Sequence, residues 1–494
     1  MARSSKGFRI ERDSMGPVKV PEGAYFGAQT QRAIENFPVS GWPLPRELIC
    51  ALGLIKFAAA RANRDLRLLK RPLAGAIEKA SQEVIRGKWD AQFVVDVFQT
   101  GSGTSTNMNV NEVIANRANE ILGSPKGIYR PIHPNDHVNM GQSSNDVFPS
   151  ALHIAATTLL RKNLLPALIH LHHLLIRKGE EFHPVLKIGR THLQDATPIR
   201  LGNEFGGYAR QVGWAIHRIE KGLESLFELP LGGTAVGTGL NTHPQFAQKA
   251  ISIISKKTGF PFREAENHFE AQGARDGAVE MSGILKTIAA SLWKIANDIR
   301  WLASGPRCGL GELRLPETQP GSSIMPGKVN PVIPESLIQV CAHVIGSDAA
   351  ITLGGLSGHF ELNAMMPLIA YHLLHSIRLL ANGVELFSNR CVEGLKADRE
   401  RCEETIEKSL ALATVLTPIL GYDQAARIAQ KAYDQRKTIR QILEEEGTFS
   451  KKELDHLLDA RSMLSPSLRP KSKRHGEQPF EKGSRRQIES SQTS

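Results

Sequence analysis

Cysteine, aromatic residues and long apolar runs are all scarce in this chain of 494 residues. No run of about 18 apolar residues occurs, which argues against a membrane-spanning helix. No Gly-x-Gly-x-x-Gly fingerprint opens a strand–helix–strand unit, so a dinucleotide cofactor is not indicated. The five cysteines are scattered without a Cys-x-x-Cys pair: Cys50, Cys308, Cys341, Cys391 and Cys402. This pattern suggests neither a disulfide framework nor a thiolate zinc site, and a reducing, cytoplasmic compartment fits it best.

The net charge of +11 raises the possibility of nucleic-acid binding. Much of the excess collects in residues 466–494, a stretch rich in Ser, Pro, Gln and Gly that we expect to be a disordered basic tail. No helix-turn-helix, zinc-finger or aromatic RNA-binding pattern accompanies it, so we expect no specific nucleic-acid partner. The basic N-terminus has no apolar segment behind it and turns acidic at Glu11 and Asp13, which argues against a secretory signal or transit peptide.

Apolar residues recur at helical spacing through much of the chain, which predicts a mainly all-α fold. The longest such segments indicate an elongated helical bundle: 151–182, 204–229, 278–303, 335–351 and 365–390. We therefore expect an N-terminal mixed helical domain over 1–143 and a central bundle with a catalytic loop over 144–400. Shorter amphipathic pieces predict a small helical C-terminal domain over 401–465: 403–415, 423–433, 437–446 and 451–460.

The segment Gly321–Pro331 carries the most chemistry for its length. Ser322 and Ser323 lie between glycines, and Lys328 and Asn330 follow closely. Its prolines exclude a helix or a central strand. Such a loop can close over an anionic substrate and supply a nucleophilic or basic oxygen with charge-stabilising donors. An ordinary surface turn has the same composition, and composition alone leaves both interpretations open.

Two further segments combine hydroxyls, amides and glycines. Thr100–Asn109 can cradle a carboxylate, and the helical pattern from Val110 onward argues against a flexible linker. The group at 142–145 is a similar donor set for an anion.

Histidines mark two other segments. His133 and His137, four residues apart, would bind a metal on a helix, but Pro134 argues against a helix there, so we expect no metal site. In Gly189–Pro198, His192 lies between polar neighbours in a loop and is a candidate general acid or base, provided that a carboxylate partners it.

Together these segments resemble the fumarase/aspartase superfamily, from about residue 8 to about residue 460. Within it the chain is similar to the class II fumarate hydratases, the metal-independent fumarase C type. His192 stands where aspartate ammonia-lyases carry glutamine, and Ser357–Asn363 resembles the fumarase form. The resemblance implies a helical homotetramer with a core of long bundles, active sites built from three subunits, and no metal or organic cofactor.

The resemblance also implies roles for individual residues. Ser322 is the expected base, and His192 with Glu335 forms the acid side. The expected substrate-binding residues are Ser102, Gly103, Thr104, Ser143, Ser144, Asn145, Thr191, Ser323, Lys328, Val329 and Asn330. A second dicarboxylate site is expected at Arg130, His133, Pro134, Asn135 and Asp136, where a structural loop is an equally good interpretation.

The implied reaction is the reversible anti addition of water to fumarate to give L-malate, a step of the tricarboxylic acid cycle. Aspartate ammonia-lyase is the alternative enzyme. The third hypothesis is a non-catalytic structural protein that keeps the fold, and the joint presence of Ser322, Lys328, Asn330, His192 and Glu335 speaks against it.

Overall fold

The computed structural model describes residues 7–466, and the fold is mainly helical, as predicted. The chain divides into two compact units: Met1–Glu181 with Gly202–Asp398, and Phe182–Leu201 with Arg399–Ser494. The predicted division into three domains at residues 143 and 400 stays a prediction. The predicted tail lies, apart from its first residue, outside the described residues.

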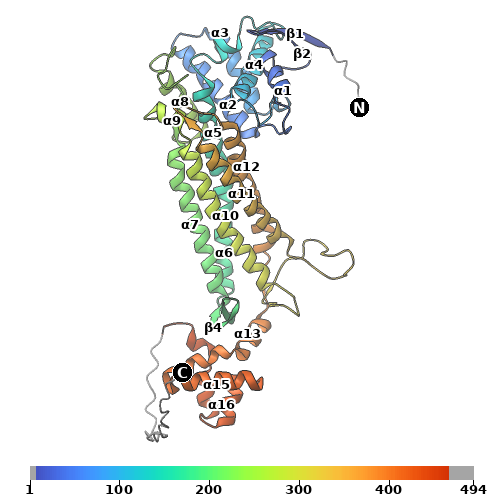
Figure 1. Ribbon diagram of the computed structural model, residues 1–494, viewed down its shortest axis with the longest axis vertical. Helices are drawn as coiled ribbons and strands as arrows, with labels where there is room; N and C mark the ends of the chain where they lie inside the picture. Colours follow the sequence, from blue (N-terminus) through green and yellow to red (C-terminus); the bar gives the residue numbers. More distant parts are fainter. Residues whose placement is uncertain (1–6, 467–494) are drawn as a thin grey trace, which may run out of the picture. The chain divides into compact units, whose positions relative to one another are not determined.

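Long helices form a bundle in the first unit (Figure 1). Their positions confirm the helical periodicity: α5 (Ser144–Leu159), which passes through a π-helical turn into α6 (Leu165–Glu181), α7 (Leu201–Leu226), α10 (Asp276–Leu302), α11 (Val332–Gly355) and α12 (Met366–Phe387). In α10, residues three or four positions apart are almost completely buried, among them Met281, Leu285, Ile288 and Leu292. Each such side chain contributes about 1.5–3 kcal/mol of hydrophobic stabilisation, which fixes the face that α10 turns inward.

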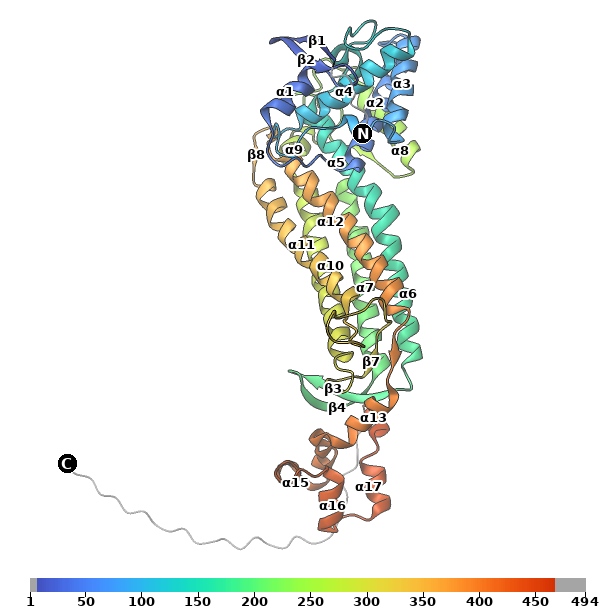
Figure 2. The same cartoon turned by 90° about the vertical axis from the view of Figure 1, so that its right-hand side faces the viewer.

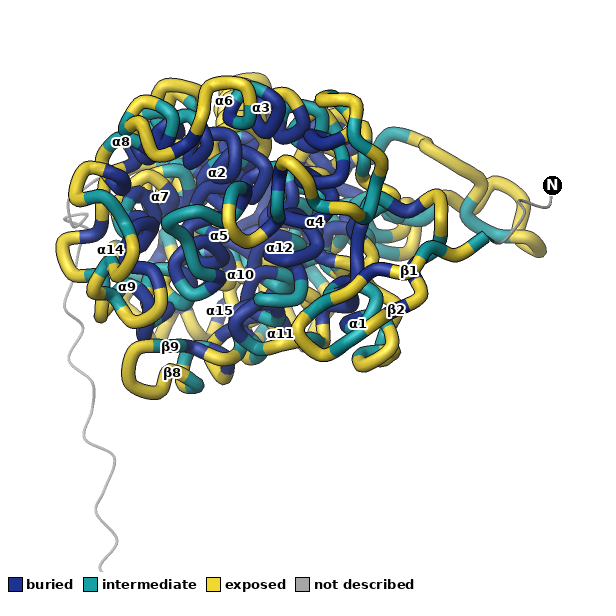
Figure 3. Tube along the Cα trace, turned by 90° about the horizontal axis from the view of Figure 1, so that it is seen from above, coloured by how far each residue is buried: buried dark blue, intermediate teal, exposed yellow. Residues whose placement is uncertain are grey.

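Further helices and a hairpin surround one end of the bundle (Figure 2). They are β1 (Phe8–Asp13), β2 (Gly16–Pro21), α1 (Ala28–Asn36), α2 (Arg46–Asp65), α3 (Arg71–Ile85), α4 (Thr104–Ile121), α8 (Phe246–Thr258) and α9 (His268–Gly273). The antiparallel β1–β2 hairpin pairs Phe8 with Pro21 and Asp13 with Gly16 and was not predicted from the sequence. Buried residues of α2, α4 and α12 lie near the middle of the view in Figure 3.

Glu112 of α4 holds the start of α1 in place. Its carboxylate accepts hydrogen bonds from the backbone N–H groups of Gly27 (2.8 Å), Gln29 (2.9 Å) and Thr30 (3.1 Å), and from the Thr30 hydroxyl (2.6 Å). These are donors that a helix N-terminus otherwise leaves without partners. Burial raises the pKa of Glu112 to about 7, against the four hydrogen bonds that lower it. A carboxylate distant in the sequence thus replaces the local cap that α1 lacks.

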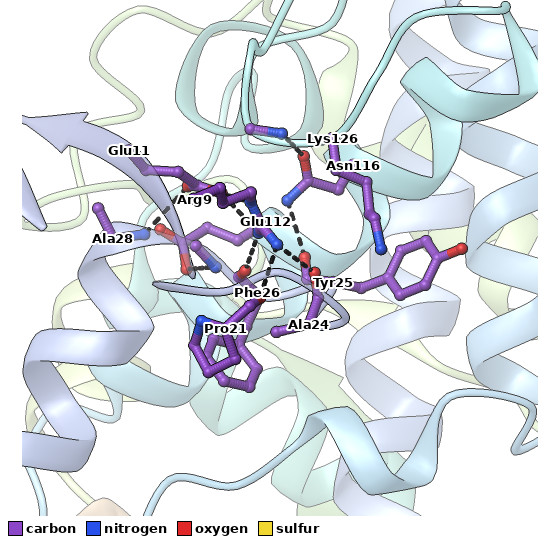
Figure 4. Close-up of polar contacts among 12 residues, drawn as sticks. Arg9, Glu11, Pro21, Ala24, Tyr25, Phe26, Ala28, Glu112, Asn116 and Lys126 are labelled. Carbon is purple, nitrogen blue, oxygen red and sulfur yellow. Dashed lines mark hydrogen bonds and ion pairs between the residues drawn. The ribbon is translucent and has the colours of Figure 1, made fainter. Parts of the chain in front are cut away.

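Arg9 in the hairpin extends this network (Figure 4). Its guanidinium donates to the Glu11 carboxylate (2.7 Å) and to the carbonyls of Pro21 (2.9 Å), Ala24 (2.8 Å) and Phe26 (2.8 Å). The bonds tie the hairpin to the segment that leads into α1.

Very short strand pairs complete the first unit: β5 (Glu228–Leu229) with β6 (Arg263–Glu264), β7 (Leu313–Arg314) with β10 (Lys396–Ala397), and β8 (Gly358–His359) with β9 (Leu362–Asn363). Within the described residues, α11 alone is long and apolar enough to cross a membrane. A core helix meets the same criterion, so this is weak support for a membrane span.

The second unit contains the hairpin β3 (Leu186–Thr191) and β4 (Gln194–Arg200) with α13 (Arg399–Lys408), α14 (Thr417–Leu420), α15 (Tyr422–Gln435), α16 (Ile439–Glu446) and α17 (Lys451–Leu457). Its core includes Leu416, Ile428, Ile442 and Leu454. The piece predicted at 403–415 is broken at Ser409, whose hydroxyl accepts from the Ala411 N–H and starts a 3₁₀ turn. The other three predicted pieces match α15, α16 and α17.

Stability should depend on pH through His153 of α5. Its Nδ1–H donates to the Glu228 carbonyl (2.8 Å), and burial, helped by the Arg275 charge, lowers the pKa of His153 to about 4. The unfolded state therefore binds more protons than the folded state between pH 6.5 and 4. The free energy of unfolding falls by up to roughly 2–3 kcal/mol as pH falls through that window.

In a His153→Gln variant, which keeps a donor for Glu228, that loss should disappear in denaturant titrations at pH 7 and pH 4.5. Exposed His170 on α6 provides the control, since His170→Gln should leave the pH dependence unchanged. An unchanged pH dependence in His153→Gln contradicts the assignment.

Candidate active site

Two segments predicted as anion donors meet at the first turns of α4 and α5. The Thr104 hydroxyl is hydrogen-bonded to the Ser144 hydroxyl (2.6 Å) and to the Ser102 hydroxyl (2.8 Å). Forty residues separate Thr104 from Ser144 in the chain. We call Ser102–Thr104 together with Ser143–Asn145 the cradle.

Local sequence explains how each half of the cradle folds. Gly103 has a φ of 73°, and a Cβ there would lie 2.1 Å from the Phe148 ring, so only glycine fits. Ser143 caps α5 by accepting from the Asn145 N–H (3.2 Å), while Asp146 accepts from the Ser143 N–H (2.9 Å). The N-cap of α4, Gly103, has no side chain, and Gln99 Oε1 instead accepts from the Thr106 N–H (3.0 Å); the positive dipole end of α4 favours an anion.

Asp146 ties a third segment to the cradle. Its fully buried carboxylate accepts from the N–H groups of Gly232 (2.9 Å) and Thr234 (3.1 Å), and burial raises the pKa of Asp146 to about 6. The Asn145 amide donates to the Ala235 carbonyl (2.8 Å). Residues 232–235 were not predicted to belong to the site, although the four glycines from 232 to 239 are a signal that the backbone there approaches another segment closely.

The loop 321–331 is closed at its base by its own groups. The Gly321 N–H donates to the Lys328 carbonyl (2.8 Å), and the Asn330 amide donates to the Gly321 carbonyl (2.6 Å). Ser322 Oγ accepts from the N–H groups of Ile324 (3.2 Å) and Met325 (3.0 Å). Lys328 Nζ donates to Asn330 Oδ1 (2.6 Å). The loop thus directs two backbone donors at Ser322 Oγ, and its ammonium at Asn330.

The loop and the cradle lie at opposite ends of α11. The loop runs directly into α11 at Val332, and a helix of 24 residues spans about 36 Å. At the far end, the Gly354 carbonyl accepts from the Asn363 amide (2.9 Å), and the Gly101 carbonyl accepts from the Met366 N–H (3.0 Å). The structure therefore does not bring Ser322 to Thr104 within one chain.

His192 lies at the turn of the β3–β4 hairpin in the second unit. His192 and Leu193 have φ values of 55° and 60° and form a two-residue turn between the paired Thr191 and Gln194. Such a turn strains non-glycine residues, and strain of this kind is concentrated at functional sites. Glu335 lies in the first turn of α11 in the first unit, where Arg300 Nη2 is 3.8 Å from its carboxylate. A pairing of His192 with Glu335 stays a prediction.

The segment at 133–138 corrects one expectation. We expected Pro134 to prevent a helix, but Pro134–Val138 forms a short π-helical turn. Proline opens the turn, where it has no N–H to lose. His133 Nδ1 caps it by accepting from the N–H groups of Asn135 and Asp136 (3.3 Å each), and Arg130, Asn135 and Asp136 are exposed. No group of three or more metal-ligating side chains occurs among residues 7–466.

Comparisons with known proteins cover both units. Residues 16–346 match the lyase family, and residues 412–465 match the fumarase C C-terminus. The class II fumarate hydratase of Neisseria meningitidis is 52% identical over 458 residues, which are 93% of this chain and 99% of that protein. The mitochondrial fumarate hydratase 1 of Arabidopsis thaliana is 51% identical over 466 residues, 94% of each chain. The crystal structure of class II fumarase from Schistosoma mansoni aligns with a TM-score of 0.89 at 40% identity, over 92% of this chain and 99% of that one.

The packing of Gly103 predicts a large stability loss in Gly103→Ala. The added methyl meets the Phe148 ring and a left-handed backbone, so we expect unfolding to become easier by roughly 2–5 kcal/mol in urea titrations. Gly75 in α3 is the control, because it has ordinary helical φ and open space around it. Gly75→Ala should be neutral or stabilise by up to about 1 kcal/mol, and equal stability of both variants would refute the packing argument.

Proposed function

The chain belongs to the class II fumarate hydratase family, and we propose that it interconverts fumarate and L-malate at a site shared between copies of the chain. The observation that carries the proposal is the loop 321–331, where two backbone N–H groups donate to Ser322 Oγ and the same loop holds Lys328 on Asn330. No metal or organic cofactor is needed for the steps that follow.

Ser322 acts as the base in the dehydration direction. A serine hydroxyl is a weak acid, and the two N–H groups and the Lys328 ammonium stabilise its alkoxide in a site that excludes water. The alkoxide removes the proton from the carbon of malate that carries no hydroxyl. The electron pair left behind spreads onto the neighbouring carboxylate and forms a dianionic aci-carboxylate.

Preorganised donors stabilise that charge. Lys328 and Asn330 of the loop and Thr104 and Asn145 of the cradle are the proposed donors, with Ser102, Gly103, Ser143, Ser144, Thr191, Ser323 and Val329 completing the substrate-binding set. Loss of one such donor typically slows catalysis by about a hundred- to a thousandfold.

His192 serves the opposite face of the substrate. The C–O bond of the intermediate breaks, and the leaving hydroxide takes a proton from His192 directly or through a water molecule. Glu335 is the proposed carboxylate partner that favours protonated His192. Base and acid on opposite faces give anti addition in the hydration direction.

The separation of loop and cradle supports a site built from several subunits. Because about 36 Å of helix lies between them in one chain, both halves can bind one substrate only if different copies supply them. Large apolar side chains on α10 and α11 are exposed in the single chain, including Trp293, Ile345 and Leu353. A homotetramer with sites formed by three subunits would cover them, and such interfaces are enriched in apolar and aromatic residues.

We also propose a cytoplasmic location and a second dicarboxylate site at Arg130 and His133–Asp136. One relative at 51% identity is mitochondrial, so the family alone does not fix the compartment. The exposed Arg130 guanidinium beside the capped turn is what supports a second anion site.

Purified protein should consume fumarate without ammonium, followed as loss of ultraviolet absorbance after exhaustive treatment with a chelator. Equal rates with and without ammonium are expected for hydration. Consumption that requires ammonium would assign the chain to aspartate ammonia-lyase, and no consumption would support a structural protein.

Ser322→Ala should lower turnover by roughly a hundredfold or more, because the proton acceptor is lost. Ser450→Ala, which removes the cap of α17, is the matched control and should alter stability only. Normal turnover in Ser322→Ala would remove the base assignment.

Mixed oligomers of Ser322→Ala and Asn145→Ala subunits test whether each active site takes its loop and its cradle from different subunits. Random mixing should restore roughly a quarter of the sites, since some combine an intact loop with an intact cradle from another copy. Absence of any restored activity contradicts a shared site.

A further inference from the structure

Lys56 of α2 is a completely buried lysine below the cradle. Its side chain is 0% exposed, and its ammonium donates three hydrogen bonds to neutral amide oxygens. The acceptors are Asn107 Oδ1 (2.8 Å), Asn139 Oδ1 (2.9 Å) and Gln142 Oε1 (3.0 Å). A lysine ammonium has three protons to donate, so these bonds satisfy it fully.

The three acceptors lie in the chain segments that adjoin the two halves of the cradle. Asn107 lies in the first turn of α4, one helical turn beyond Thr104. Gln142 directly precedes Ser143, the cap of α5. Lys56 therefore bonds to the two segments that the Thr104–Ser144 hydroxyl pair joins from above.

Further bonds fix the loop between the two segments. Asn139 Oδ1 also accepts from the amides of Asn107 (3.2 Å) and Asn111 (3.1 Å), and the Asn139 amide donates to the Gln142 carbonyl (3.0 Å). The Gln142 amide donates to the carbonyls of Val138 (3.1 Å) and Met140 (3.2 Å). The network leaves the backbone before α5 few alternative positions.

The charge of Lys56 has no direct counter-ion. Within residues 7–466, no carboxylate lies within ion-pair distance of its ammonium. The carboxylate whose charge acts on it is that of Asp146, which is itself engaged by the N–H groups of Ser143, Gly232 and Thr234. Burial lowers the pKa of Lys56 to about 7, and the attraction of Asp146 raises it.

A buried charge without a direct counter-ion lowers the stability of the fold, so its presence calls for a functional reason. The most direct use is at the cradle, whose adjoining segments Lys56 binds and which is proposed to receive a carboxylate of a substrate with two negative charges. This step rests on the proposed function.

We propose that Lys56 is a positioning residue that holds both halves of the cradle in register and supplies the buried positive charge by which the site prefers a dicarboxylate to a monocarboxylate. Lys56 acts through Asn107, Asn139 and Gln142 and does not touch the substrate.

Two variants separate the charge from the geometry. Lys56→Met removes the ammonium and keeps the length of the side chain. Asn139→Asp keeps the ammonium and the acceptor at Oδ1 but places a carboxylate against it, so that the charge is neutralised. It also loses the bond to the Gln142 carbonyl, which should affect any ligand of the cradle alike.

The measurement is the ratio of dissociation constants for succinate, a dianion, and succinamate, its monoanionic half-amide, by calorimetry on the assembled protein. Each variant should reduce the preference for succinate by roughly tenfold, because loss of one buried positive charge weakens the attraction for a dianion more than for a monoanion. The Michaelis constant for fumarate should rise more than turnover falls.

Lys178→Met is the matched control. Lys178 of α6 is also a buried lysine, with its ammonium on Glu181 Oε2 (2.8 Å) and the Leu395 carbonyl (2.8 Å), outside the cradle. Its replacement should lower stability and leave the preference for succinate unchanged.

The outcomes distinguish this inference from the proposed function. Wild-type protein that neither hydrates fumarate nor binds succinate contradicts the function itself. Active wild-type protein whose two variants keep the full preference for succinate overturns the role of Lys56. If Lys56→Met does not fold, Asn139→Asp decides alone, because a purely structural role predicts an unchanged ratio there.

Discussion

The fold of the first unit depends on the requirement that a buried polar group finds its hydrogen-bond partners. Glu112, Asp146 and Lys56 are nearly or completely buried, and each is satisfied by groups distant in the sequence. Glu112 binds the start of α1, Asp146 binds the backbone at 232–234, and Lys56 binds α4 and the loop before α5. A buried charge without these bonds would cost several kcal/mol, so each bonded set specifies one arrangement of its segments.

This requirement also shapes the cradle. A pair of helix N-termini presents N–H groups and hydroxyls only if the two helices start at the same place. The Thr104–Ser144 hydroxyl pair shows that α4 and α5 do so, and the amides around Lys56 hold them from beneath. The cradle is therefore preorganised before any substrate binds, and donors that need no rearrangement are the ones that stabilise a developing charge.

The length of α11 has the opposite effect, because it keeps the loop 321–331 away from the cradle of the same chain. One rigid helix thus separates the proposed base from the proposed anion donors. In the proposed assembly this separation makes activity depend on association. The exposed apolar side chains of α10 and α11 and the proposed chemistry of the loop then both require that subunits associate.

The sequence by itself determined the helices and the chemical character of the site. Apolar spacing located α10, α11 and α12, because burial of one helical face leaves a local periodic record. The loop 321–331 and the cradle segments were also evident, because hydroxyls, glycines and amides in short runs are local features. Only the tertiary structure decided which segments meet: that Thr104 lies on Ser144, that 232–235 joins them, that Pro134 opens a helical turn, and that Lys56 lies beneath. In the sequence Lys56 is a single lysine within an apolar stretch, and its partners lie 51 to 86 positions away. Such contacts leave no periodic pattern, because they follow from how whole helices pack and not from the spacing of neighbouring residues.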